Sequence, residues 1–311
     1  MKNHISLFIF AIALLSGPVS ANDLSMTAVK DTLASIPGEH NYIYVRTPLG
    51  EDEEKNYDEI TFYDGLGREL DFAQSYGADR AGAIMAHHHL IEYDSLGRKE
   101  KQWLSTNTSF SYMSPEDLKG GVLWDYHDAG KRSYLQTNYE SSPLNRITEQ
   151  YGVGDAWGDH PARMEYLTNI PADSLRCSFY FIDDNDSLIR RGDYRSGELQ
   201  VTKATDEDGK PTYTFVDKQG RTLLTRLGRG NQQADTYFVF DRFGRIRYVL
   251  PPMINDEISA GNLDLYAYQY LYDSFGRCIS KKLPGCAAIG YVYDKADRVI
   301  PLRSIIGFAR F

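Results

Sequence analysis

Three groups of residues have types that could support chemistry: a histidine run, clustered carboxylates and the cysteines. His87, His88 and His89 are consecutive, and in a strand the first and third would point to the same side. Two imidazoles could begin a metal site, but such a site needs further ligands, and no other histidine or cysteine lies at a recognisable ligand spacing. We therefore expect no metal ligand in this chain.

The carboxylates are the second group. Asp183-Asp184 and the run Glu51-Asp52-Glu53-Glu54 could supply a general acid and base only if the fold held two carboxyls about 5 to 10 Å apart across a cleft. Charge runs usually lie on solvated loops instead. The sequence contains no Gly-x-Ser-x-Gly elbow, no phosphate-binding loop and no Cys-His signature. We predict no catalytic residue, no cofactor and no enzymatic activity.

The cysteines are Cys177, Cys278 and Cys286, an odd number that leaves one thiol over in an oxidising compartment. Cys278 and Cys286 form the candidate disulfide, because Leu283-Pro284-Gly285 between them is a turn signal. The alternative is two unpaired thiols, since the sequence does not give the Cα separation that a disulfide requires.

A short unit recurs along the chain: an aromatic or apolar residue, Asp, two variable residues, Gly and a basic residue. The five strict copies contain Asp64, Gly67 and Arg68; Asp94, Gly97 and Arg98; Asp217, Gly220 and Arg221; Asp241, Gly244 and Arg245; and Asp273, Gly276 and Arg277. Two looser copies begin at Thr205 and Tyr293.

This unit predicts the tip of a β-hairpin. The Asp side chain can accept a hydrogen bond from the backbone two residues on, and Gly adopts the left-handed conformation that completes a type I turn with a bulge. The basic residue opens the returning strand, where it could pair with an acid on a neighbouring hairpin or remain a solvated charge. A calcium loop would need alternating oxygen ligands and a terminal Glu, which no copy has.

The segments around these tips are rich in β-branched and aromatic residues, as in Thr236–Phe240 and Arg245–Leu250. The 23 tyrosines also favour sheet surfaces over helices. We therefore predict an all-β fold, in which antiparallel hairpins form a strip with a curved open sheet and one irregular insertion.

The sequence divides into four segments. Residues 1–21 have the charged, apolar and small-residue order of a secretory signal with cleavage after Ala21, and their apolar run is too short for a transmembrane anchor. Residues 22–40 are the linker, residues 41–300 the sheet domain, and residues 301–311 a tail unlike the repeat. Export would place the protein in the periplasm, at the cell surface or outside the cell.

The irregular insertion spans about residues 105–175. Ser114 followed by Pro115 is predicted to cap a short helix. Trp124 and Trp157 lie in this insertion, where exposed rings would suit a sugar or peptide partner. The alternative is that these rings cover hairpin edges.

The charge limits the partners. With 43 acidic and 34 basic residues, the net charge of −9 gives no basic field for nucleic acid. An envelope glycan, or another protein that pairs with an exposed sheet edge, is the expected kind of partner.

The repeated Tyr-Asp-x-x-Gly-Arg unit resembles the RHS/YD-repeat family. Over about residues 40–300 the chain also resembles the uncharacterised N-terminal domain that precedes YD repeats in large exported proteins of Gram-negative bacteria. The segments that carry this resemblance include Asn41–Tyr44, Phe62–Arg68, Ser142–Arg146, Glu149–Gly152, Thr205–Gly209, Val249–Pro252 and Lys282–Cys286.

The resemblance implies a hairpin strip that, in complete family members, spirals into a hollow cocoon around a C-terminal cargo, often a toxin, and ends in an aspartyl self-cleaving core segment. Only Val299–Phe311 follow the last repeat here, so encapsulation and self-cleavage are not carried over. The chain is expected to be the first section of a longer design, either a truncated copy or a stand-alone shell piece.

We therefore expect an exported, non-catalytic protein that serves as a scaffold or binding surface at the cell envelope. The alternative is a module that binds or hydrolyses carbohydrate, based on the acidic charge and the supply of Tyr and Trp.

Overall fold

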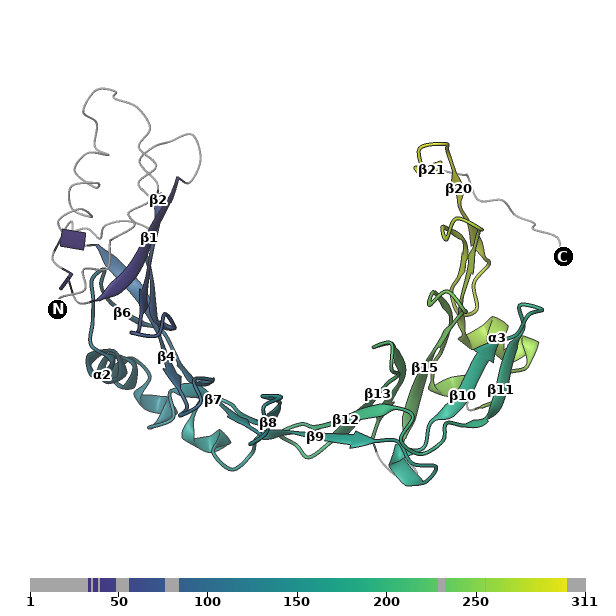
Figure 1. Ribbon diagram of the computed structural model, residues 1–311, viewed down its shortest axis with the longest axis horizontal. Coiled ribbons are helices and arrows are strands. Elements are labelled where there is room, and N and C mark those ends of the chain that lie inside the picture. Colours follow the sequence, from purple (N-terminus) through teal and green to yellow (C-terminus); the bar gives the residue numbers. More distant parts are fainter. Residues whose placement is uncertain are drawn as a thin grey trace. The chain divides into compact units, whose positions relative to one another are not determined.

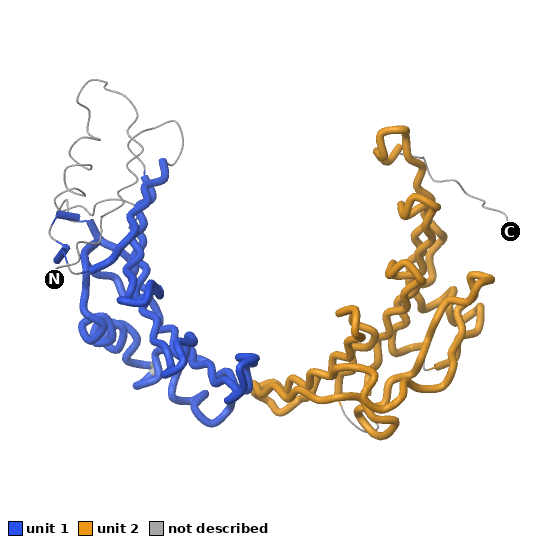
Figure 2. The backbone as a smooth tube through the Cα atoms, viewed as in Figure 1, with its two compact units in different colours: residues 1–161 blue, residues 162–311 orange. Residues whose placement is uncertain are grey.

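The computed structural model describes residues 33–34, 36–38, 40–48, 56–75, 84–228, 233–254 and 256–300. The predicted signal segment, most of the linker and the tail lie outside the described residues. The chain divides into two compact units, residues 1–161 and 162–311 (Figure 2). The boundary falls within the stretch that the sequence predicts to be irregular.

Unit 1 is built on antiparallel strands, most of which pair with their neighbours in the sequence (Figure 1). Its strands are β1 (Asn41–Pro48), β2 (Asn56–Tyr63), β3 (Glu69–Ser75), β4 (Met85–Tyr93), β5 (Lys99–Trp103), β6 (Thr106–Ser109), β7 (Tyr134–Tyr139) and β8 (Ile147–Tyr151). Strand β4 divides its pairing: its first half pairs with β6 and its last residues with β5. The sheet then continues from β5 to β7 and from β7 to β8.

Alternation along the strands places the core of unit 1 on one face of the sheet. Ile60 and Phe62 on β2, Ala73 on β3 and Ala86 on β4 are buried together with Phe110, which follows β6. Helix α2 (Pro115–Asp125) begins as predicted, because the Ser114 side chain accepts a hydrogen bond from the Asp117 backbone amide. Two short 3-10 turns, η1 (His127–Ala129) and η2 (Asp155–Trp157), complete the unit.

The strands of unit 2 are also antiparallel, and their order begins with β9 (Ala162–Thr168) paired to β12 (Gln200–Thr205). The order then follows the chain through β13 (Pro211–Val216), β14 (Thr222–Leu227), β15 (Ala234–Phe240), β16 (Ile246–Leu250), β17 (Tyr268–Tyr272), β18 (Cys278–Lys282) and β19 (Ile289–Gly290). A last small pair joins β20 (Val292–Tyr293) to β21 (Val299–Ile300).

A separate hairpin, β10 (Ser178–Ile182) with β11 (Leu188–Asp193), packs against the sheet of unit 2 at β15 (Figure 1). Tyr180 meets Tyr237 of β15 edge to face, with ring centroids 4.9 Å apart. Phe215, Leu224 and Val239 from the sheet are buried in the same cluster. The elements around this core include η3 (Asp173–Leu175), η5 (Pro252–Ile254) and α3 (Ala260–Tyr266).

The predicted fold class is confirmed: the described structure is nearly all β, antiparallel and open, with two short α-helices. The stretch at 105–175 is more regular than expected, since β6, β7, β8 and β9 all lie in it. Among the described residues, no helix combines the length and apolar character needed to cross a membrane.

The candidate disulfide between Cys278 and Cys286 is not formed, and both thiols are free. The register explains why: Ser280 pairs with Gly290, so Cys278 lies far along β18 from the turn in which Cys286 lies. At about 3.3 Å per residue this separation is on the order of 20 Å, well beyond the Cα distance that a disulfide spans. Leu283-Pro284-Gly285 does form the expected turn, but the turn does not bring the two cysteines together.

Candidate functional site at the hairpin tips

Each strict copy of the repeat forms a hairpin tip with the same hydrogen bonds. At the first tip, Asp64 Oδ1 accepts from the backbone amides of Leu66 and Arg68 at 2.8 and 2.9 Å. Gly67 has φ of +78°, the left-handed region that a side chain would strain. The tips that begin at Asp94, Asp217, Asp241 and Asp273 repeat these bonds.

The basic residue pairs with the Asp of its own tip rather than with an acid on a neighbouring hairpin. Arg68 Nε donates to Asp64 Oδ2 at 2.7 Å, and Arg98 does the same to Asp94. The prediction that this residue pairs with an acid on a neighbouring hairpin is therefore wrong for these tips, because the turn already holds the Asp carboxylate beside the Arg of the same tip. Arg277 does both: it pairs with Asp273 and also reaches Asp297 of the next tip at 2.5 Å.

The same guanidinium lies over the aromatic residue that precedes the next tip, so successive tips form a ladder. Arg68 lies 4.5 Å from the centroid of the Tyr93 ring, and Arg245 lies 4.8 Å from that of Tyr272. Cation–π contacts of this kind contribute about 0.5–1 kcal/mol at exposed sites. The other rungs are Arg98 over Tyr139, Arg221 over Phe240 and Arg277 over Tyr293.

Tyrosine hydroxyls close four of the five rungs. Tyr93 donates its hydroxyl to the carbonyl of Glu69, the residue after Arg68, at 2.7 Å. Three further tyrosines bond the carbonyl at the corresponding position of the preceding tip: Tyr139 to Lys99, Tyr272 to Ile246 and Tyr293 to Cys278. Phe240 occupies this position without a hydroxyl. The tyrosine surplus thus has a structural use at the tips.

Two further tips do not follow the repeat pattern. Glu140 and Arg146 form one that is two residues longer, with Nε and Nη2 of Arg146 each 2.7 Å from the Glu140 carboxylate. Asp183 begins the other, where Asp186 takes the left-handed position with φ of +65° in place of Gly. Tyr139 before the acid and Arg146 after it were the available signal for the first of these.

Hydrogen bonding favours the ionised carboxylates at the tips. The Arg68 backbone amide, assisted by its guanidinium, lowers the pKa of Asp64, and Arg98 acts likewise on Asp94. At the longer tip, the Arg146 guanidinium and then the Ser142 hydroxyl lower the pKa of Glu140 to about 2. These acids are held as charged structural groups, which fits a turn better than proton transfer.

In several tips the residue just before the Gly is a large apolar side chain exposed to solvent. Leu66 and Phe275 are 80% and 82% exposed, and Leu96 and Phe243 are each 67% exposed. These rings and aliphatic side chains lie on a neutralised base of Asp–Arg pairs. The tips therefore present apolar contact points beside paired Asp and Arg side chains, and the tip at Phe243 also carries Arg242.

The histidine run is split between the two faces of β4. His88 is buried, with Nδ1 2.6 Å from Asp71 Oδ2 and Nε2 3.0 Å from the Ser109 carbonyl. Because that carbonyl can only accept, Nε2 carries a proton, and the histidine and Asp71 share another across the short contact. His87 and His89 point to the opposite face. Within the described part of the chain, no group of three or more His, Cys, Asp or Glu could hold a metal ion.

The buried carboxylates have structural partners. Asp58 accepts from the Tyr44 hydroxyl at 2.7 Å and from two nitrogens of Arg46 at 2.7 and 2.9 Å. Asp183 and Asp184 lie in the tip between β10 and β11, and the run 51–54 lies outside the described residues.

Trp103 donates its indole N–H to Glu92, whereas Trp124 is 84% exposed.

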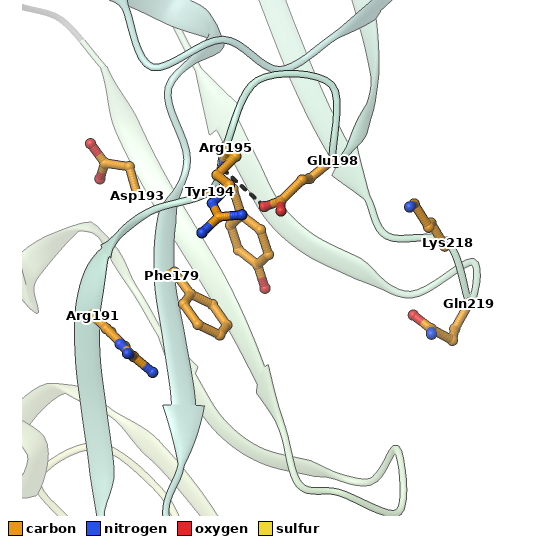
Figure 3. Close-up of a pocket in the computed structure, with 8 residues that line it drawn as sticks. All are labelled: Phe179, Arg191, Asp193, Tyr194, Arg195, Glu198, Lys218 and Gln219. Carbon is orange, nitrogen blue, oxygen red and sulfur yellow. Dashed lines mark hydrogen bonds between the residues drawn. The ribbon is translucent and has the colours of Figure 1, made fainter.

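Two adjoining hollows of about 560 and 590 Å³ lie in unit 2 beside the β10–β11 hairpin. Both are lined by Phe179 and Gln219. In the first, the rings of Phe179 and Tyr194 lie together on one side, while Lys218 and Gln219 project from a hairpin tip on the other (Figure 3). The mixture of rings and charges suits binding, and no nucleophile–base pair lines either hollow.

Comparison with known proteins gives a family match over part of the chain. A family model described as a domain of unknown function (DUF6443) matches residues 41–168. No curated protein matches the chain.

Solved structures give the wider likeness. The crystal structure of TcdB2-TccC3 is 14% identical, with a TM-score of 0.51 over 84% of this chain and 12% of that chain. The structure of TcdB2-TccC3-Cdc42 is 15% identical with a TM-score of 0.53, and covers 84% of this chain and 12% of that chain. The structure of TcdB2-TccC3 without its hypervariable C-terminal region is 13% identical, with a TM-score of 0.53 over 88% and 13%. At these identities the likeness shows the fold, and the chain spans only a small part of the chains it matches.

Proposed function

We propose that this chain is a structural component of a protein wall, in which stacked β-hairpins act as a scaffold and perform no catalysis. The observation that carries the proposal is the ladder at the tips, where each Arg joins its own Asp to the aromatic ring of the next hairpin. A side-chain seam of this kind would stiffen an open sheet. The similar fold in TcdB2-TccC3 supports the same interpretation.

The wall that we propose is a section of an RHS-type shell. The tips carry the Tyr-Asp-x-x-Gly-Arg unit of that family, and the fold likeness extends over 84% of the chain. A shell section needs neighbours, and in the described structure β1 pairs with β2 alone while β19 pairs with β18 alone. Such edges suit another chain that adds a strand. Size-exclusion chromatography with light scattering should detect self-association or a complex, and a strict monomer with every candidate partner would contradict this.

Export belongs to the same proposal. The charged, apolar and small-residue order of residues 1–21 is that of a secretory signal, which would deliver the wall component to the periplasm, the cell surface or the medium. Fractionation of expressing cells, followed by intact-mass measurement, should find a mature chain that starts at Asn22. Unprocessed protein confined to the cytoplasm would overturn the export step.

A hydrolase assay tests the proposal that the chain performs no catalysis. Envelope glycans and peptides should remain uncleaved, and a glycan array should show no specific binding. Asp58→Asn and Asp71→Asn change two buried carboxylates, so they are the variants to compare if an activity appears. An activity that disappears in either variant while the circular dichroism spectrum is retained would replace the scaffold with an enzyme.

A further inference from the structure

An aromatic surface in unit 2 is left open between the β10–β11 hairpin and the main sheet. Phe179 and Phe181 are alternate residues of β10 and share one face, with ring centroids 5.5 Å apart and planes at 24°. Tyr194 meets Phe179 edge to face at 4.8 Å. We call this surface, together with Phe238 and Phe243 across it, the aromatic groove; the two adjoining hollows form it.

The rim of the aromatic groove is basic. Arg191, Arg195 and Lys218 line one hollow and Arg242 lines the other. Among the described residues, no carboxylate forms an ion pair with any of these four side chains.

The acids nearby are already engaged. Glu198 accepts a hydrogen bond from the Arg195 backbone amide at 2.9 Å, and Asp193 lies 3.5 Å from Arg190. Asp241 is held by Arg245 in its own tip. In a chain of net charge −9, the groove is thus a local surplus of cations without a carboxylate partner, around four half-buried rings and the exposed ring of Phe243.

We propose that the aromatic groove binds an extended peptide segment that alternates large apolar and acidic side chains. The apolar side chains would cover the Phe rings, and the carboxylates would reach the rim, where charge-assisted hydrogen bonds are available. A neutral saccharide would leave the rim cations unused, and Phe rings offer a sugar no hydrogen-bonding group. This inference goes beyond the scaffold role and stands whether or not the chain is a wall component.

Fluorescence anisotropy with the full-length mature protein tests the proposal. The probe is a labelled seven-residue peptide of alternating Glu and Phe. Two comparison peptides replace its Glu by Lys or its Phe by Ser. Saturable binding of the first peptide, weakened at least tenfold by 0.5 M NaCl and by either replacement, is the expected result. No saturable binding, or equal binding of the Lys peptide, overturns the proposal.

Matched variants locate the site. Phe243→Ala and Lys218→Glu should each weaken binding about tenfold, whereas Phe275→Ala and Lys295→Glu should leave it unchanged. Each control occupies the same position of another tip, outside the groove, so loss of a tip side chain alone cannot explain the difference. Equal losses in both sets, or tighter binding of polygalacturonate than of the acidic peptide, would contradict the assignment.

Discussion

At the scale of single residues, the chain uses tyrosine where phenylalanine would fill the same space. The hydroxyl of Tyr272 donates to the Ile246 carbonyl at 2.9 Å while Arg245 covers its ring. The residue thus joins two tips by two different interactions, one polar and one through the ring face. A high tyrosine content is visible in the sequence, but the carbonyl that each hydroxyl reaches depends on the hairpin stacking.

Tyr272→Phe should lower the free energy of unfolding by about 0.5–1.5 kcal/mol, because it removes one hydrogen bond and keeps the ring. The natural control is Phe240, which occupies the same position on another tip. Phe240→Tyr should be neutral or stabilising, since Thr222, the residue after Arg221, has its carbonyl at the corresponding position of the preceding tip. Urea unfolding midpoints measure both changes, and an unchanged midpoint in Tyr272→Phe would show that the hydroxyl has no structural role.

The buried pair of Asp71 and His88 gives a second residue-level prediction. His88→Leu should cost about 3–5 kcal/mol, because it leaves a buried carboxylate without its partner, and Asp71 Oδ1 already has none among the described atoms. The double variant Asp71→Leu with His88→Leu should recover much of this loss. A double variant that is as unstable as the two single changes combined would show that the pair is not coupled.

At the scale of elements, the tips explain how much of this molecule could be predicted from sequence. The Asp, Gly and Arg positions are read directly, because backbone hydrogen bonds and a left-handed residue impose them locally. The partner of each Arg was predicted less well, since stacking on Tyr93 or Tyr272 depends on the next hairpin. The longer tip at Glu140 could not be predicted from the repeat, because its spacing differs. The aromatic groove could not be predicted either, because β10 and β15 meet only in the folded chain.

Left-handed backbone at the tips yields a prediction about glycine. Gly276 has φ of +84°, so Gly276→Ala should cost about 1–2 kcal/mol, whereas Gly276→Asn should cost less. The chain itself places Asp186 and Asp297 at such positions, with φ of +65° and +59°. Gly261→Ala in α3 is the control and should stabilise slightly, because beyond the adjacent residues and the backbone of its own helix no atom lies within 4 Å of the new methyl group. Thermal unfolding would rank these variants, and equal costs for Ala and Asn would contradict the argument.

At the scale of the whole molecule, repetition makes small local contributions accumulate. The tips with depressed carboxyl pKa values occur in both units, at Asp64 and Asp94 in one and at Asp217, Asp241, Asp273 and Asp294 in the other. No single tip has to contribute much, since exposed ion pairs are individually weak. The pH dependence of the chain should therefore reflect many equivalent groups.

Acid should destabilise this protein through its tips. The six Asp residues just named have folded-state pKa values below the value of about 3.9 expected in the unfolded chain, so their contribution is complete above that pH and is lost as the pH falls through the folded-state pKa. For Glu140 the corresponding window runs from 4.5 down to about 2. The urea concentration at the unfolding midpoint should therefore decrease as the pH is lowered from 4.5 to 2. Asp64→Asn with Asp94→Asn keeps an oxygen to accept the amide hydrogen bonds but cannot titrate, so this variant should be less stable at pH 6 and lose less on acidification. Parallel pH profiles for the variant and the natural chain would show that the acid sensitivity arises elsewhere.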